Sequence, residues 1–136
     1  MADYSKPLPL IDEESKPFWD AAKQHQFVLH HCKNCGTYYY PASYCRKCAT
    51  LAHMEWAPAS GKGTLYTYII MHQVYQPGFK GEVPYNVSIV ELEEGPFFLT
   101  NIINCKNEDL KIGMPVQVVF DDATEEVSLP KFKPAG

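Results

Sequence analysis

Hydrophobic and aromatic positions divide the chain into one short helical segment followed by many extended ones. Phe18, Trp19 and Ala22 fall on one face at helical spacing, Ser15 can cap the segment, and Pro17 suits its first turn. This pattern predicts a helix over residues 15–24. The proline-containing stretch before it predicts an extended arm.

After the helix, the pattern changes to short runs rich in Tyr, Ile, Val, Thr and Phe, which favour strands. Turn residues separate these runs, and a loop that we expect to be mobile follows the first long one over residues 76–84. A single helical turn is predicted over 107–110. The extended segments are expected at 27–30, 38–40, 64–74, 85–92, 97–104, 116–120 and 127–132.

The last five of these segments, with a helical turn between the third and fourth, are typical of a small OB-type barrel. A plain five-stranded sandwich fits the same pattern. The sequence thus predicts a mainly β protein with one short N-terminal helix.

Four of the five cysteines form two Cys-x-x-Cys units, Cys32/Cys35 and Cys45/Cys48. Two intervening residues let each unit turn both sulfurs toward one point, and two such units supply the four thiolates of a tetrahedral site. Redox Cys-x-x-Cys pairs are expected at a helix start, which this region lacks. A site closed by four thiolates has no open position for substrate, so we expect a structural metal.

The identity of the metal is open between zinc and iron, because tetrahedral sulfur suits both. Zinc is favoured because nothing in the sequence suggests electron transfer. His30, His31 and His53 lie near the cysteines and are potential ligands. Four cysteines already complete the shell, so we do not expect these histidines to bind metal.

Composition excludes several functional classes. The chain has 136 residues, a net charge of -4, and no apolar run near the ~20 residues of a membrane helix. Its start resembles no signal peptide, so we expect a cytoplasmic protein with no membrane partner. The glycine-rich loops of nucleotide-binding motifs are also absent from the sequence.

Candidate catalytic residues are few. Cys105 could be a nucleophile, but no partner base can be assigned to it, and a free thiol without a chemical role is the commoner case. His72 could be a general base, although a rim histidine is more frequent. The acidic pairs lie in or beside turns, where solvated charge is expected. The sequence contains no convincing catalytic constellation.

Nine tyrosines offer surfaces for stacking or for protein contacts. Residues 57–136 hold six basic and ten acidic side chains, which disfavours a nucleic-acid backbone as partner. A nucleic-acid-binding module is therefore the alternative function, and a rubredoxin-like electron carrier is a third. A few lysines on a tyrosine-rich surface also suit a phosphorylated small molecule such as coenzyme A.

Several motifs in this order resemble a known family of acyl-CoA-associated proteins, in which a rubredoxin-like zinc ribbon precedes an OB-fold domain. The similarity covers nearly the whole chain. Its motifs are Pro17-Phe18-Trp19, the two Cys-x-x-Cys units, residues 60–66 (SGKGTLY), Val83-Pro84-Tyr85, Glu94-Gly95-Pro96, Leu99-Thr100-Asn101 and residues 112–116 (IGMPV).

The resemblance implies an arm and helix over residues 1–26, a zinc ribbon over 27–58 and an OB-fold domain over 59–136. It implies structural Zn2+ at Cys32, Cys35, Cys45 and Cys48. Family members bind thiolase-fold enzymes, whose large subunit carries the catalytic residues, and include partners of acetoacetyl-CoA thiolases, of sterol side-chain thiolases and aldolases, and of aromatic polyketide acyltransferases.

The resulting hypothesis is a non-catalytic accessory subunit of a thiolase or acyl-CoA acyltransferase complex, which helps to shape the acyl-CoA site. The most specific form is the small subunit of benzoylsuccinyl-CoA thiolase of anaerobic toluene degradation. The partner or acyl-CoA contacts expected on this hypothesis are Phe18, Trp19, Tyr39, Tyr68, His72 and Tyr85.

Overall fold

The structure, a computed structural model, describes residues 6–135. Of the predicted N-terminal arm, residues 1–5 lie outside the described part, and residues 6–11 form no helix or strand. The predicted helix is confirmed as α1, Lys16–Lys23, with a proline in its first turn. None of the helices within residues 6–135 is long and apolar enough to cross a bilayer.

Ser15 occupies the N-cap position of α1, but its side chain does not cap the helix. Its backbone N–H donates to Oδ1 of Asp12 (2.8 Å), and its Oγ accepts from the Asp12 N–H (3.1 Å). The predicted capping bond is therefore replaced by a reciprocal pair, which folds the chain before the helix into a turn.

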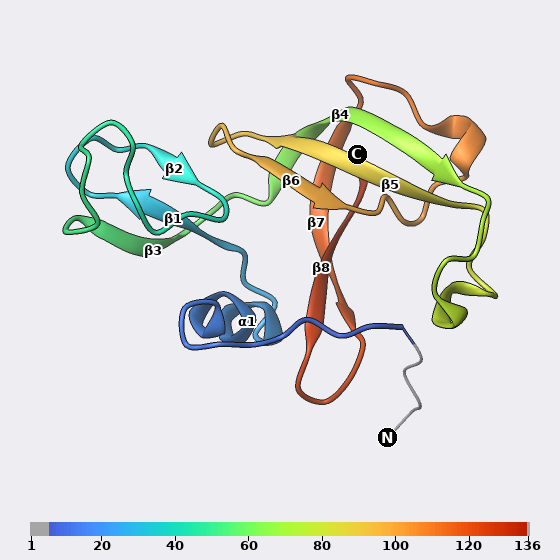
Figure 1. Cartoon of the computed structure of the whole chain (residues 1–136). Coiled ribbons are helices and arrows are strands. Elements are labelled where there is room, and N and C mark those ends of the chain that lie inside the picture. Colours follow the sequence, from blue (N-terminus) through green and yellow to red (C-terminus); the bar gives the residue numbers. More distant parts are fainter. Residues whose placement is uncertain (1–5, 136) are drawn as a thin grey trace.

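A small antiparallel sheet of order β2-β1-β3 follows α1. Its strands are β1 (Val28–Cys32), β2 (Tyr38–Tyr39) and β3 (Met54–Pro58). β1 pairs with β3 along its whole length, from Val28 opposite Pro58 to Cys32 opposite Met54. The long segment between β2 and β3 projects from this sheet and carries the second cysteine pair (Figure 1).

The second sheet has five antiparallel strands in the order β6-β5-β4-β7-β8. Its strands are β4 (Lys62–Met71), β5 (Tyr85–Leu92), β6 (Phe97–Thr100), β7 (Pro115–Asp122) and β8 (Ser128–Pro134). Short 3-10 turns, η1 (Pro77–Phe79) and η2 (Asn107–Asp109), lie in the two long connections. This confirms the predicted mainly β fold, and the sheet is curled into a half-barrel.

The chain just after β6 brings the two outer strands together. Ile102 and Phe132 form a parallel bridge, in which the Ile103 N–H donates to the Phe132 carbonyl (2.7 Å). The buried Asn86 of β5 holds the same segment, since its side-chain amide donates to the Ile102 carbonyl (2.8 Å) and its Oδ1 accepts from the Ile102 N–H (2.7 Å).

Two predicted strands end earlier than expected. The run 64–74 stops at Met71, because Met71 faces Tyr85, where the partner strand β5 begins. The run 97–104 leaves β5 after Thr100, because the following residues turn toward β8. Strand β5 and the helical turn at 107–109 agree with the prediction.

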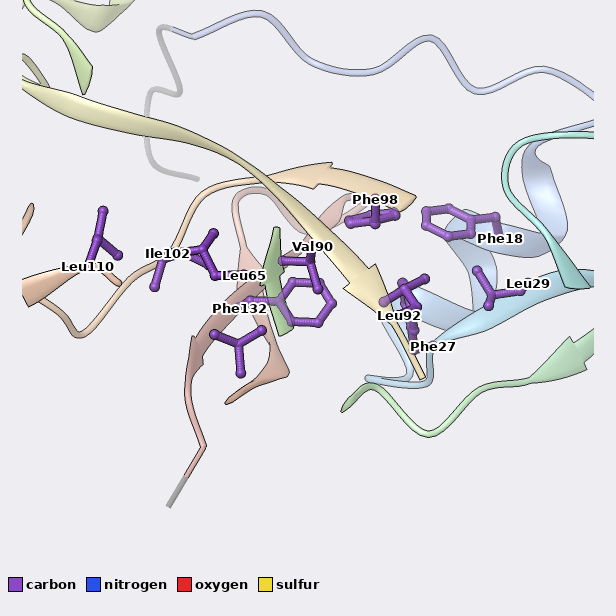
Figure 2. Close-up of a cluster of buried hydrophobic side chains, with 11 residues drawn as sticks. Phe18, Phe27, Leu29, Leu65, Val90, Leu92, Phe98, Ile102, Leu110 and Phe132 are labelled. Atoms are coloured by element: carbon purple, nitrogen blue, oxygen red, sulfur yellow. The ribbon is translucent and has the colours of Figure 1, made fainter. Parts of the chain in front are cut away.

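One hydrophobic cluster joins α1 and β1 to the five-stranded sheet (Figure 2). Phe132 is fully buried, and its ring centroid lies 5.9 Å from that of Phe98 and 6.1 Å from that of Phe27. Phe18 of α1 is 4% exposed and packs against Phe27 and Phe98. The helix and the first sheet are thus fixed to the half-barrel by aromatic packing.

Candidate metal centre and neighbouring cavities

The four clustered cysteines meet at the tip of the small sheet. Cys32 ends β1, Cys35 lies in the turn that leads toward β2, and Cys45 and Cys48 lie in the segment between β2 and β3. Gly36 has a φ of +78°, a left-handed conformation that glycine adopts without strain. Its N–H donates to the Cys32 carbonyl (2.8 Å), which closes the first turn.

All four sulfurs lie within 4.8 Å of one another. The distance from Sγ of Cys32 to Sγ of Cys48 is 3.9 Å, and that from Cys35 to Cys45 is 3.5 Å. A tetrahedron with metal–sulfur bonds of about 2.3 Å has sulfur–sulfur edges of about 3.8 Å. The cysteines are therefore placed to bind one metal ion.

Hydrogen-bond donors surround the sulfurs. The Cys48 N–H donates to Sγ of Cys45 (3.3 Å), and the Asn34 amide donates to Sγ of Cys48 (3.2 Å). The Tyr39 hydroxyl lies 3.4 Å from Sγ of Cys45. This hydroxyl is the main cause that lowers the pKa of Cys45 to about 6. Such contacts favour thiolates, which are the metal-binding form of cysteine.

The nearby histidines make other contacts. His30 accepts at Nδ1 from the Ala42 N–H (3.2 Å), and its ring lies 3.7 Å from that of Trp56. Burial lowers the pKa of His30. His31 contacts the Glu55 carboxylate through Nδ1 (2.9 Å). Within residues 6–135, the metal-binding group consists of cysteines alone.

The six aromatic and histidine residues expected at a partner or acyl-CoA contact do not gather at one place. Phe18 and Tyr39 are buried inside the chain, which leaves little of either side chain for a partner. Tyr68 is half-buried and its hydroxyl donates to the Leu110 carbonyl (3.4 Å). His72 is exposed just beyond the end of β4. Trp19 and Tyr85 remain partly exposed and line cavities.

Tyr85 lines a cavity of about 390 Å³ between β5, β8 and the loop before β5. Phe79 stacks on Tyr85 with ring centroids 5.1 Å apart. Lys131 lies on the same cavity and donates to Oδ1 of Asn101. Burial lowers the pKa of Lys131. The cavity thus combines an aromatic pair with a partly buried amine.

Cys105 lines this cavity as well. Its thiol donates to the Lys106 carbonyl (3.5 Å), and burial raises its pKa. Within the described chain, no hydrogen bond connects its sulfur to a histidine. A thiol with a raised pKa is a weak nucleophile at neutral pH.

Two residues of this region were not singled out from the sequence. Asn86 lies in a run of strand-forming residues, and no local pattern indicates its bonds to Ile102, sixteen positions away. For Lys131 the sequence does contain an indication. Lys131 alternates with Pro130 and Phe132 along β8, which are buried, so its side chain lies on the opposite face of the strand.

Two family models match the chain. A model described as the rubredoxin-like zinc ribbon domain of ChsH2 matches residues 19–52, and one described as the C-terminal OB-fold domain of ChsH2 matches residues 56–121. Both agree with the fold, and the first agrees with the cysteine geometry.

Related sequences carry several names. A "DUF35 domain-containing scaffold protein" of Methanocaldococcus jannaschii is 44% identical over 96 residues, which cover 70% of this chain and 67% of the relative. A "Probable enoyl-CoA hydratase alpha subunit" of Thermomonospora curvata is 36% identical over 132 residues. That match spans 96% of this chain but only 40% of the longer relative.

A solved structure titled "Ltp2-ChsH2(DUF35) aldolase" contains a chain with the same architecture. It has a TM-score of 0.84 and 35% sequence identity, and the match covers 95% of this chain and 100% of that chain. On these grounds the chain belongs to the DUF35 family, whose members of the ChsH2 type join a rubredoxin-like zinc ribbon to an OB-fold domain.

Proposed function

We propose that this chain is a non-catalytic accessory subunit of an acyl-CoA enzyme complex, and that its catalytic partner has a thiolase fold. The main support is the likeness to the ChsH2 chain of an aldolase over 95% of this sequence. The names of two relatives, a scaffold protein and a hydratase subunit, support a role within a larger assembly. The thiolase fold of the partner rests on the resemblance of the sequence motifs.

The metal in this proposal is a structural Zn2+ bound by Cys32, Cys35, Cys45 and Cys48. Its support is the zinc-ribbon family match and the sulfur–sulfur distances of 3.5 and 3.9 Å. Four thiolates fill the coordination shell, so the ion would hold the tip of the small sheet and take no part in catalysis.

In this proposal the acyl-CoA contacts the chain at the cavity lined by Tyr85 and Lys131. Its support is chemical, since the Lys131 amine can pair with a phosphate and the rings of Phe79 and Tyr85 with an aromatic base. The carboxylates of Glu82 and Asp121 line the same cavity. Trp19, Tyr68 and His72 are the remaining proposed contacts. Benzoylsuccinyl-CoA is the most specific substrate proposed, on overall sequence likeness.

Co-expression tests the proposal directly. The chain is produced with a thiolase-fold enzyme from the same genome, with an affinity tag on one of the two proteins. We expect the pair to copurify, to coelute on size exclusion, and to cleave or condense an acyl-CoA faster together than the enzyme does alone. Benzoylsuccinyl-CoA and acetoacetyl-CoA serve as the two substrates.

Separate elution, with thiolase activity that is the same with and without this chain, would contradict the proposal. Copurification with a hydratase and not with a thiolase would contradict the partner's fold while keeping the accessory role. If this chain speeds the turnover of acetoacetyl-CoA but not that of benzoylsuccinyl-CoA, the benzoylsuccinyl-CoA assignment is contradicted.

A further inference from the structure

A second, smaller cavity lies between the start of α1, β1 and the end of β2, and neither the four clustered cysteines nor Lys131 lines it. Phe18, Trp19 and Tyr40 also line a neighbouring cavity that includes Lys131. Its volume is about 150 Å³. Aromatic rings form its walls and carboxylates stand at its rim. The residues that matter for its chemistry are Phe18, Trp19, Tyr40, Trp56, Asp12 and Glu14.

The aromatic rings lie at an angle to Phe18, and Trp56 also packs on His30, a further ring of the lining, with centroids 3.7 Å apart. Phe18 is buried and central, with ring centroids 5.1 Å from Trp19, 5.4 Å from Tyr40 and 6.1 Å from Trp56. The Phe18–Trp19 pair is nearly perpendicular, and the other two are tilted by 43° and 46°. These edge-on and tilted contacts hold the rings in place around the cavity that all four of them line.

The charge at the rim is negative. Oδ1 of Asp12 accepts from the Ser15 N–H, and Oε1 of Glu14 accepts from the Ser43 hydroxyl (2.9 Å). These bonds place both carboxylates at the cavity while their side chains stay exposed. Among the described residues that line the cavity, none is lysine or arginine.

We propose that this cavity binds the guanidinium of an arginine side chain presented by the catalytic subunit. A cation gains from the faces of Trp and Tyr rings, and arginine makes this contact more often than lysine. A planar guanidinium can also stack on a ring while it donates to a carboxylate at its edge. The source of the arginine rests on the proposed function, whereas the chemistry of the cavity does not.

The chain offers an internal reporter for this test. Its two tryptophans both line the cavity, so the two indole N–H signals of 15N-labelled protein report on it. N-acetyl-arginine amide is the probe, and N-acetyl-citrulline amide is its neutral isostere. We expect both indole signals to shift saturably with the arginine amide, and the citrulline amide to bind at least about tenfold more weakly.

Matched variants identify the carboxylate. Glu14→Gln keeps the acceptor for Ser43 and removes the charge, and we expect it to weaken binding of the arginine amide about threefold to tenfold. Ser43→Ala removes the hydrogen bond and keeps the charge, so we expect a smaller change. Glu126→Gln, at an exposed position in the turn before β8, controls for net charge and should leave binding unchanged.

Equal shifts with the arginine and citrulline amides, or equal binding by wild type and Glu14→Gln, would overturn the inference. In the copurified complex, Glu14→Lys should weaken subunit association at least about tenfold, whereas Glu126→Lys should not. A complex that tolerates Glu14→Lys overturns the inference and leaves the accessory role standing. If the chain binds the arginine amide but forms no complex with a catalytic subunit, the proposed function is contradicted and the guanidinium site stands.

Discussion

The tip of the small sheet and the half-barrel are held together by different means. Between residues 32 and 54, the buried side chains are Cys32, Tyr39 and Cys45, which are two proposed metal ligands and the tyrosine that contacts one of them. In the five-stranded sheet, the buried side chains are mostly aliphatic or aromatic, with Leu65, Val90 and Phe132 at its centre.

This difference shows that the two regions draw their stability from separate sources. A cluster of three buried residues cannot offset the conformational entropy of twenty ordered ones, so the tip needs metal–thiolate bonds. The half-barrel has a larger apolar core, so we expect it to fold without an ion. Between them lie Phe18 and Phe27, which belong to the barrel's cluster although they precede the cysteines in the chain.

The largest effect is expected from removing a ligand. Cys32→Ser should lose most of the bound zinc and unfold the tip, because small zinc domains gain about 10–16 kcal/mol from the metal. The five-stranded sheet should stay folded. Metal analysis and amide exchange of both regions measure this, and Cys105→Ser, whose sulfur lies outside the cluster, should bind zinc like the wild type.

Retained zinc in Cys32→Ser would contradict the assigned site. Simultaneous loss of amide protection in β4 and β5 would contradict the separation of the two regions. It would mean that the metal also supports the half-barrel through α1 and β1.

The converse experiment removes the centre of the barrel. Phe132 is fully buried between Phe27 and Phe98, so Phe132→Ala should lower the free energy of unfolding by about 3–5 kcal/mol. Urea unfolding measures this loss. Zinc content at low denaturant should not change, and Phe132→Leu serves as the milder variant with an expected loss of about 1 kcal/mol.

An unchanged unfolding midpoint in Phe132→Ala would show that the barrel does not depend on this cluster. Zinc loss at low denaturant would show that the tip depends on the barrel's packing. Either result would remove the contrast between the two regions.

A polar group also contributes inside the barrel. Asn86→Ala leaves the N–H and the carbonyl of Ile102 without their side-chain partner, and we expect a loss of about 2–4 kcal/mol. Asn86→Asp keeps an acceptor for the Ile102 N–H but places a buried carboxylate against the Ile102 carbonyl, so its loss at neutral pH should be larger. Thermal unfolding compares the two, and equal stability of Asn86→Ala and wild type would contradict the role of this bond.

The sequence predicted those parts of the molecule that depend on local signals. Pro17 and the spacing of Phe18, Trp19 and Ala22 predicted α1, and the two Cys-x-x-Cys units predicted the metal-binding group. These signals span a few residues, so neighbouring positions alone carry them. The proposed division of the chain at residues 26 and 58 and the cytoplasmic location stay predictions.

The remaining features depend on contacts between distant positions. The bonds of Asn86 with Ile102 and the bridge between Ile102 and Phe132 arise only when strands far apart in the chain meet. The early end of β4 has the same origin, because the length of a strand is limited by its partner. Tyr39 was expected at a partner contact, but pairing of β2 with β1 places it inside, against Cys45.

The smallest expected effect refines the picture of the tip. Tyr39→Phe keeps the buried ring and removes the hydroxyl that lies 3.4 Å from Sγ of Cys45. Groups that hydrogen-bond to a ligand change metal affinity about tenfold or more, so we expect a roughly tenfold weaker zinc affinity with the fold intact. Competition with a chelator of known affinity measures it.

Tyr38→Phe is the matched control, because Tyr38 is the neighbouring residue of β2 and its ring packs on His31, away from the sulfurs. A tenfold loss of zinc affinity in Tyr39→Phe but not in Tyr38→Phe means that the Tyr39 hydroxyl inside the tip strengthens zinc binding. Equal affinities mean that the ring of Tyr39 acts only by filling space, as Phe132 does in the barrel. The tip would then differ from the half-barrel only in its metal, because buried side chains would stabilise both regions by filling space.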